Sequence, residues 1–402
     1  QSINQEDIQS VVDVLRSDRL TQGPKVSEFE QALCDLTGAR HCIAVANGTV
    51  ALHLACLVLD IGTGHTGITS PISFMASANC IAYCGGTPAF ADIDPETLCL
   101  SPDRLEEICE QGPPPRVVIP VDFAGVPANL PRFRALSERY GFFLIEDAAH
   151  AIGSTYTFDG IPYACGSCAH TDLAILSFHP VKTITTGEGG AVLTNDPALA
   201  HRLRCLANHG IERDPELFVS PCSSSLDPCP PYYHEMQALG FNARLTDIHA
   251  ALGLSQLKCL EAFKTRRQEI ARQYNQAFQP LEKEQKVLLP PWPDHTAPCF
   301  HLYTLRLGPE AGLTRDELFY RLHNKGILCQ VHYIPIYRQP FYQERYDYDP
   351  GSFPQAEHYY ETCLSLPLFP GLDDESVRFV TETVLSTFHT SFESRPLWSD
   401  TC

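Results

Sequence analysis

Short apolar runs that alternate with helix-like segments constrain the fold of this chain most. Seven runs have the length and the β-branched or apolar content of buried strands. They lie at residues 41–46, 67–70, 88–93, 116–121, 142–145, 173–176 and 191–194. Segments with helical periodicity, such as 49–59 and 130–140, lie between most of them. The alternation predicts βαβ units, and therefore an α/β protein with a mainly parallel seven-stranded sheet covered on both faces.

The pattern changes after the last of these strands. Residues 211–238 are rich in Pro, Ser and Cys, which is typical of a long surface loop, of a lid or of plain disorder. A helical stretch at 246–278 follows. Beyond it we expect short strands at 303–307 and 330–333 and helices near 316–324 and 374–386. The sequence therefore predicts a large domain at residues 1–255 and a smaller C-terminal α+β domain at residues 256–402.

The balance of charges excludes some partners. The chain carries 48 Asp and Glu against 29 Lys and Arg, a formal net charge of −19. Nucleic acids and anionic membrane surfaces need a basic footprint, so we expect neither as a partner. No apolar run reaches the roughly 18 residues of a membrane span, and we find no secretory signal, so we expect a cytoplasmic protein.

The 17 cysteines are scattered along the chain. Without a secretory signal, we interpret them as small buried thiols in a reducing compartment. Cys165 and Cys168 form a C-x-x-C pair, which occurs in redox-active proteins and in half zinc sites. Neither a second pair at zinc spacing nor a thioredoxin-like pattern accompanies it, so we predict no metal site.

The turn between the last two predicted strands carries the strongest chemical signal. It begins at Ser177, contains Lys182 and ends in residues 187–190 (GEGG), three of which are glycines. Glycines let the backbone approach a ligand, and hydroxyls and free N–H groups suit a phosphate. A desolvated lysine can lose its proton far below the usual pKa of about 10.4 and act as a nucleophile, although a surface lysine in a turn has the same sequence. A dinucleotide site is an alternative, but Val192 stands where G-x-G-x-x-G needs its last glycine.

Other candidate groups also follow strand ends. Gly48 and Thr49 would direct amides and a hydroxyl at an anion on a helix N-terminus, although a plain helix cap looks the same. Asp147 follows a buried strand, with His150 close behind, and a dry carboxylate needs a cationic partner. Phe74 can stack on a flat ring or pack in the core. We expect these groups together, because the carboxyl ends of parallel strands meet at one edge of a sheet.

Together these are the parts of a site for pyridoxal 5′-phosphate (PLP). Lys182 would carry the cofactor as a Schiff base, and Asp147 would face the pyridinium nitrogen. Gly48, Thr49 and Ser177 would hold the phosphate. With its ring nitrogen kept protonated, the cofactor can take up the electrons of a substrate carbanion, and Lys182 is the natural base to move the proton.

Six motifs in order along the chain resemble the DegT/DnrJ/EryC1/StrS family of sugar-nucleotide aminotransferases, which are fold-type-I PLP-dependent transferases. The motifs are residues 20–23 (LTQG), 47–49 (NGT), 71–74 (PISF), 146–150 (EDAAH), 177–182 (SFHPVK) and 240–245 (GFNARL). Segments 121–125, 184–186 and 330–337 are most similar to the pseudaminic-acid branch. That branch makes UDP-4-amino-4,6-dideoxy-N-acetyl-β-L-altrosamine with L-glutamate as amino donor.

The resemblance implies roles for particular residues. Lys182 is then the Schiff-base lysine and Asp147 the pyridinium partner, with Ser177 and Thr49 at the phosphate. Asn242 would reach the site of a neighbouring subunit, which implies a homodimer with composite active sites. The residues expected to line the sugar-nucleotide site are Leu20, Thr21, Gln330, Val331, His332 and Tyr333.

The expected reaction is a two-step transamination from glutamate to C4 of a UDP-linked 4-keto sugar. Alternatives are another nucleotide-sugar 4-aminotransferase, of the bacillosamine, perosamine or viosamine type, and a non-catalytic family member. A sugar dehydratase of this family would carry histidine at the lysine position, so Lys182 argues against it. The chain departs from the family at Asn47, where many relatives have serine, and in the 211–238 insertion, for which we recognise no counterpart.

Overall fold

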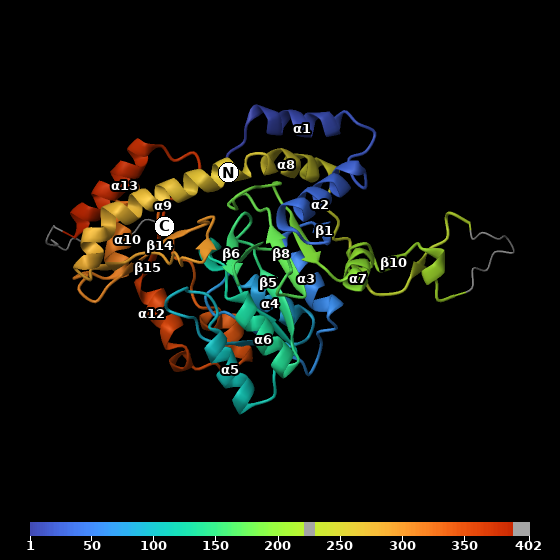
Figure 1. Ribbon diagram of the computed structural model, residues 1–402, viewed down its shortest axis with the longest axis horizontal. Coiled ribbons are helices and arrows are strands. Elements are labelled where there is room, and N and C mark those ends of the chain that lie inside the picture. Colours follow the sequence, from blue (N-terminus) through green and yellow to red (C-terminus); the bar gives the residue numbers. More distant parts are fainter. Residues whose placement is uncertain (221–229, 389–402) are drawn as a thin grey trace, which may run out of the picture.

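The computed structural model describes residues 1–220 and 230–388, and a seven-stranded sheet lies at its centre (Figure 1). The strand order is β1-β9-β8-β5-β4-β2-β3. These strands are β1 (His41–Val45), β2 (Thr66–Thr69), β3 (Thr87–Phe90), β4 (Val117–Ile119), β5 (Phe143–Asp147), β8 (Leu173–Ser177) and β9 (Gly190–Thr194). Only β9 runs antiparallel to its neighbours in this sheet. The predicted α/β fold with a mainly parallel sheet is confirmed.

Helices cover both faces of the sheet. Those on one face are α3 (Gly48–Val58), α4 (Ala76–Tyr83) and α7 (Pro197–Ala207), and those on the other are α2 (Pro24–Thr37), α5 (Pro102–Gln111), α6 (Leu130–Tyr140) and α8 (Asp247–Leu257). Successive strand residues serve opposite faces, so Ile43 packs in one core and Ala44 in the other. Because both faces are dry, β8 and β9 are buried at every position. This is why the strands read as continuous apolar runs in the sequence.

The first helix, α1 (Gln5–Leu15), packs along α8 (Figure 1). Asn4 and Asp7 form a capping box at its start: the Asp7 amide donates to Asn4 Oδ1 at 3.0 Å, and the Asn4 amide donates to Asp7 Oδ2 at 2.9 Å. Pro24 begins α2, and Gly38, with φ at 81°, ends it. These capping residues fix the helix boundaries locally.

The C-terminal part has a core of its own. Its three-stranded antiparallel sheet consists of β12 (Val287–Leu288), β14 (Tyr303–Leu307) and β15 (Cys363–Leu366). Its helices are α9 (Leu260–Lys283), α10 (Arg315–His323), α11 (Pro340–Arg345), α12 (Pro354–Thr362) and α13 (Asp374–Thr387). Helices α9, α10 and α13 bury their apolar faces against this sheet. The arrangement is α+β, as expected, and the boundary between residues 255 and 256 stays a prediction.

One sequence-based expectation for this part is wrong, and another lacks a detail. The stretch at 246–278 is helical as expected, but it is divided into α8 and α9, because the amides of Lys258 and Cys259 bond to carbonyls three residues back and so tighten the turn between the two helices. Residues 330–333 are not a strand: only Gln330 pairs with Ser365. Beyond Gln330 the backbone leaves the sheet, and the side chains of His332 and Tyr333 contact Ser365 and His150.

The described parts of the 211–238 segment, residues 211–220 and 230–238, project from the body of the molecule beyond α7 (Figure 1). Its described flanks form a short antiparallel ribbon of β10 (Ile211–Glu212) and β11 (Glu235–Met236). The loop prediction missed this ribbon, while residues 221–229 lie outside the described residues. Also unpredicted is a small sheet of β6 (Thr155–Phe158), β7 (Ile161–Ala164) and β13 (Thr296–Ala297).

The cysteines within residues 1–220 and 230–388 all carry free thiols, Cys165 and Cys168 among them. Both of these thiols are buried, and burial raises the pKa of each. In the same ranges, no helix is both long and apolar enough to cross a bilayer.

Candidate active site

A cavity of about 740 Å³ opens at the carboxyl ends of the central strands. Its walls come from the turns after β1, β2, β5 and β8 and from the segment after α10. The predicted site residues that line it are Gly48, Thr49, Phe74, Asp147, His150, Ser177, Lys182 and Tyr333. A second cavity, of about 610 Å³, lies between α1, α2 and α8 and is lined by none of the predicted site residues.

Gly48 begins α3 at the rim of the larger cavity. Asn47 caps the helix by accepting from the Val50 amide at 2.9 Å. This leaves the amides of Gly48 and Thr49 available to an anion at the positive end of the helix. A Cβ on Gly48 would lie 3.0 Å from Ser177 Cβ, so only glycine lets the helix approach Ser177 this closely. Asn47, the departure from the family pattern, is therefore a helix cap here.

Asp147 ends β5 and is buried, only 3% exposed. Its Oδ2 accepts from Ser77 Oγ at 2.6 Å and its Oδ1 from the Ala149 amide at 3.2 Å. Burial raises the pKa of Asp147, while these two hydrogen bonds and the Lys182 charge act in the opposite direction. A cation placed in the cavity beside this carboxylate would offset the cost of its desolvation. Ser77, on α4, was missed by the sequence analysis, although it follows the recognised motif at 71–74.

Lys182 is held by a tightly bonded turn between β8 and β9. The Lys182 amide donates to the carbonyl of His179 at 2.8 Å, and the Thr186 amide donates to that of Phe178 at 3.0 Å. Phe178 anchors the turn in the core, where its ring meets that of Phe29 at 5.1 Å. Burial lowers the pKa of Lys182 to about 8, although Asp147 acts to raise it. The amine is thus available as a nucleophile or base close to neutral pH.

Aromatic and imidazole groups also line the cavity at His150 and Tyr333, and His301 packs against His150. Tyr333 Oη lies 3.3 Å from His150 Nε2, and the rings of His150 and His301 lie 4.2 Å apart. Burial, together with the nearby Lys182 charge, lowers the pKa of His150 and of His301 well below the usual range. Both rings are therefore neutral at neutral pH. His301 was missed by the sequence analysis, because it lies in a loop before β14 that carries no motif.

Several predicted residues do not line the cavity. His332 lies next to it: its Nδ1 contacts Ser365 Oγ at 2.8 Å, and burial together with Lys182 lowers its pKa to about 4. Asn242 is exposed and pairs through its backbone with Asn208. The others that lie outside the cavity of this single chain are Leu20, Thr21, Gln330 and Val331. Conversely, the cavity contains Ser73, His179 and Glu188, which the sequence analysis did not select.

Comparison with known proteins identifies the class of enzyme. The model of the DegT/DnrJ/EryC1/StrS aminotransferase family matches residues 1–385. The chain belongs to this family. It is 38% identical over 384 residues to the spore coat polysaccharide biosynthesis protein SpsC of Bacillus subtilis (strain 168), a match that covers 95% of this chain and 94% of SpsC. The predicted family, fold class and enzyme class are confirmed.

Solved structures of the family agree. Helicobacter pylori PseC, an aminotransferase involved in the biosynthesis of pseudoaminic acid, superposes with a TM-score of 0.83 at 30% identity, over 96% of this chain and 97% of PseC. Spr1654 of Streptococcus pneumoniae, in its PLP form, superposes with a TM-score of 0.83 at 27% identity, over 96% of this chain and 97% of Spr1654. The protein is a sugar aminotransferase that uses PLP, an amino donor and a keto nucleotide-sugar, so the predicted cofactor is confirmed.

The residues around the cavity fit PLP. Gly48 leaves a gap next to Ser177 that the Cβ of any other residue at position 48 would fill. This gap lies at a helix N-terminus, which is suited to a phosphate. Asp147 offers a dry carboxylate to a protonated ring nitrogen. His150 Nδ1 has no hydrogen-bond partner among the described residues, which leaves it available to a ligand.

Proposed function

We propose that this enzyme transfers the amino group of L-glutamate to C4 of a UDP-linked 4-keto-6-deoxy-N-acetylhexosamine. The product would be UDP-4-amino-4,6-dideoxy-N-acetyl-β-L-altrosamine. One observation carries the transamination: Lys182 and Asp147 line the same cavity, next to an anion site between Gly48 and Ser177. The likeness to PseC and the segments at 121–125, 184–186 and 330–337 support the choice of sugar.

The residues that would hold the cofactor are Gly48, Thr49, Phe74, Asp147, His150, Ser177 and Lys182. Bound PLP supplies an electron sink for a carbanion formed at the carbon next to nitrogen. Lys182 Nζ, with its pKa lowered to about 8, can take and return the proton that moves in each half of the reaction. The negative charge of the Asp147 carboxylate would stabilise the protonated form of the cofactor's ring nitrogen.

A panel of UDP- and dTDP-linked 4-keto sugars, each offered with glutamate, tests the substrate. We expect the UDP-linked N-acetylated sugar to give the highest kcat/KM, with the product identified by mass spectrometry and its C4 configuration by NMR. Preferred amination of another sugar would replace the proposal with a bacillosamine, perosamine or viosamine type of 4-aminotransferase. If no sugar is aminated while one equivalent of glutamate still becomes 2-oxoglutarate, the sugar assignment fails and the transaminase assignment stands.

We also propose a homodimer with composite active sites. Asn242 and its neighbour Phe241 are exposed and lie outside the cavity of their own chain, as do Leu20 and Thr21. A second copy of the chain would bring such groups to the cavity. Light scattering measures the number of chains per particle. Mixing inactive Lys182→Ala chains with weakened Asn242→Ala chains tests whether each active site contains residues of both chains. Activity of the mixture above that of either variant supports composite sites, and a monomer or an inactive mixture contradicts them.

A further inference from the structure

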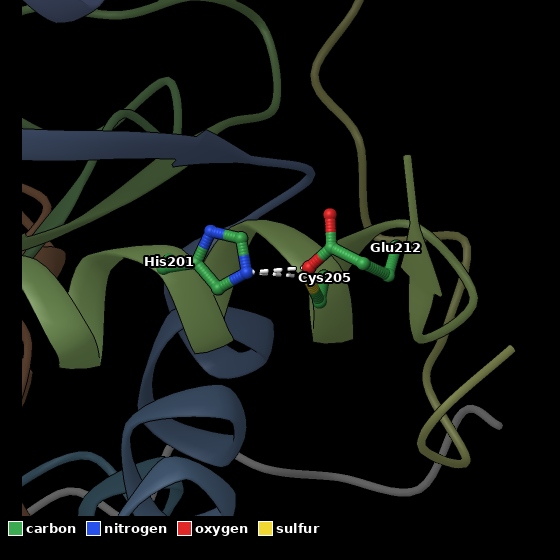
Figure 2. Close-up of side chains that lie close together, drawn as sticks. All are labelled: His201, Cys205 and Glu212. Atoms are coloured by element: carbon green, nitrogen blue, oxygen red, sulfur yellow. Dashed lines mark hydrogen bonds and ion pairs between the residues drawn. The ribbon is translucent and has the colours of Figure 1, made fainter. Parts of the chain in front are cut away.

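Three metal-ligating side chains converge at the base of the projecting segment, where α7 meets β10 (Figure 2). His201 and Cys205 lie one helical turn apart on α7 and therefore share a face, and Glu212 faces them from β10. His201 Nε2 lies 2.6 Å from Glu212 Oε2, and Cys205 Sγ lies 3.7 Å from each of these atoms. None of the three residues lines either cavity.

The spacing of the three atoms is close to that of a tetrahedral zinc site. Zn–S bonds of about 2.3 Å and Zn–N and Zn–O bonds of about 2.0–2.1 Å place ligand atoms about 3.3–3.6 Å apart. The two distances to Cys205 Sγ, both 3.7 Å, already match this spacing. To bind the metal, the distance between His201 Nε2 and Glu212 Oε2 must increase by less than about 1 Å. The His201 side chain is 44% exposed and has room to make that movement.

Glu212 is held in place as the carboxylate of a metal site would be. Its Oε1 accepts from the amides of Arg213 at 2.7 Å and Asp214 at 2.8 Å, which leaves Oε2 facing His201 and Cys205. The Glu212 side chain is only 6% exposed. Backbone donors that fix a ligating carboxylate in this way are typical of metal centres. A cation would also offset the desolvation of this buried charge.

We propose that His201, Cys205 and Glu212 bind one Zn²⁺ ion, with water as the fourth ligand. A set of one imidazole nitrogen, one thiolate and one carboxylate suits zinc better than magnesium or calcium. On binding, the Cys205 thiol loses its proton to solvent, and His201 coordinates through Nε2 as a neutral ring protonated at Nδ1. The ion would fasten β10, and with it the start of the 211–238 segment, to α7.

Binding competes with protons. In the metal-free protein, burial and the Glu212 carboxylate raise the pKa of the Cys205 thiol to about 11. Cys205 therefore donates a weak hydrogen bond to Glu212 until a metal displaces its proton.

Metal titrations of the PLP-loaded protein test the site. After treatment with a chelator, zinc affinity is measured by competition with a chromogenic chelator for the wild type and for His201→Gln, Cys205→Ser and Glu212→Gln. The control is Cys259→Ser, another partly buried free cysteine, located between α8 and α9. We expect one tight equivalent per chain in the wild type and the control, and a loss of about 100-fold or more in affinity in each ligand variant. Equal affinity in the wild type, His201→Gln and Cys205→Ser would overturn the proposal.

Cobalt identifies the ligands directly. We expect the visible bands of tetrahedral Co²⁺ and a near-ultraviolet thiolate-to-cobalt band, recorded as a difference spectrum against the same protein without cobalt so that the cofactor absorbance cancels. The thiolate band must vanish in Cys205→Ser and remain in Cys259→Ser, and its persistence in Cys205→Ser would contradict the assignment. If Glu212→Gln fails to fold, the other two variants still decide, because His201 is exposed and Cys205 only partly buried.

Discussion

The two sides of the active-site cavity differ in origin and in charge. One side, the floor, consists of Gly48, Asp147, Ser177 and Lys182, all at or just beyond the ends of sheet strands or at a helix start. The other side, the wall, consists of His150 and Tyr333, which line the cavity, with His301 packed against His150 and His332 packed against Tyr333, and all four lie in loops. The floor holds the ionisable pair Lys182 and Asp147, whereas burial lowers the pKa of every wall histidine. We therefore expect the floor to perform the chemistry and the neutral wall to adjust it.

Lys182→Ala tests this division most severely. It removes both the nucleophile and the base, so we expect kcat for transamination to fall by at least about 10³-fold. The measurement is the rate of 2-oxoglutarate formation with the preferred 4-keto sugar. Lys325→Ala, at an exposed position, is the control and should keep its activity. Borohydride should fix PLP covalently to the wild type and to the control but not to Lys182→Ala, and residual turnover within tenfold of the wild type would remove the proposed base.

Asp147→Asn should cause the second largest loss of kcat. The amide keeps the shape and still accepts a hydrogen bond from Ser77, but it loses the charge that faces the cavity. We expect kcat to fall by about 10²–10³-fold, as when one preorganised electrostatic group is removed. PLP should still bind, as judged by its absorbance after gel filtration. If Asp147→Asn lowers kcat no more than Ser77→Ala does, the charge of Asp147 does not contribute to catalysis.

The pKa of Lys182 gives a test that needs no cofactor. With a pKa of about 8, rather than the usual value of about 10.4, the neutral fraction of this amine at pH 7 is about 10²-fold larger than that of an exposed lysine. Trace acetylation of the PLP-free protein across pH, mapped by mass spectrometry, should give a midpoint near 8 for Lys182. Asp147→Asn should move the midpoint to lower pH, because Asp147 acts to raise the pKa of Lys182. An unchanged or higher midpoint in that variant would mean that the two groups do not interact.

The sequence predicted the floor far better than the wall, and the reason is geometric. Lys182, Asp147 and Gly48 follow buried strands, and parallel topology brings strand ends together whatever the loops do. His301 has no such constraint, since it reaches the His150 ring only because the C-terminal part folds back onto the sheet. Tyr333 was suggested by family resemblance, while the strand expected at 330–333 does not form. Local periodicity does not show a long-range contact such as that between Tyr333 and His150.

The His201–Cys205–Glu212 cluster shows the same limit. The sequence predicts no metal site, because no second cysteine pair stands at zinc spacing. The i, i+4 spacing of His201 and Cys205 was visible in the sequence, but on a helix this spacing is common by chance. Only the ribbon of β10 and β11, which the loop prediction missed, brings Glu212 against them.

Gly48→Ala probes the part of the floor that acts through shape alone. The new Cβ would meet Ser177 Cβ at 3.0 Å and Ser177 Oγ at 3.1 Å, so α3 or Ser177 must shift by a few tenths of an ångström. We expect PLP affinity to fall about tenfold, since a displacement of about 1 Å can cost 10²-fold. Gly112→Ala is the matched control, because the nearest atom to its Cβ would lie 3.9 Å away. Equal PLP affinities for the two variants would show that the close approach to Ser177 is not needed.

Tyr333→Phe should have the smallest effect and tests the wall. It removes the hydroxyl that lies 3.3 Å from His150 Nε2 but keeps the ring that faces Phe74 at 6.3 Å. Because one neutral hydrogen bond contributes about 0.5–1.5 kcal/mol, we expect kcat/KM to fall only about two- to tenfold. Tyr320→Phe, at a side chain that is 52% exposed, should leave kcat/KM unchanged. A loss above about 10²-fold would place the Tyr333 hydroxyl among the groups that move protons, and the division between a reactive floor and a neutral wall would have to be abandoned.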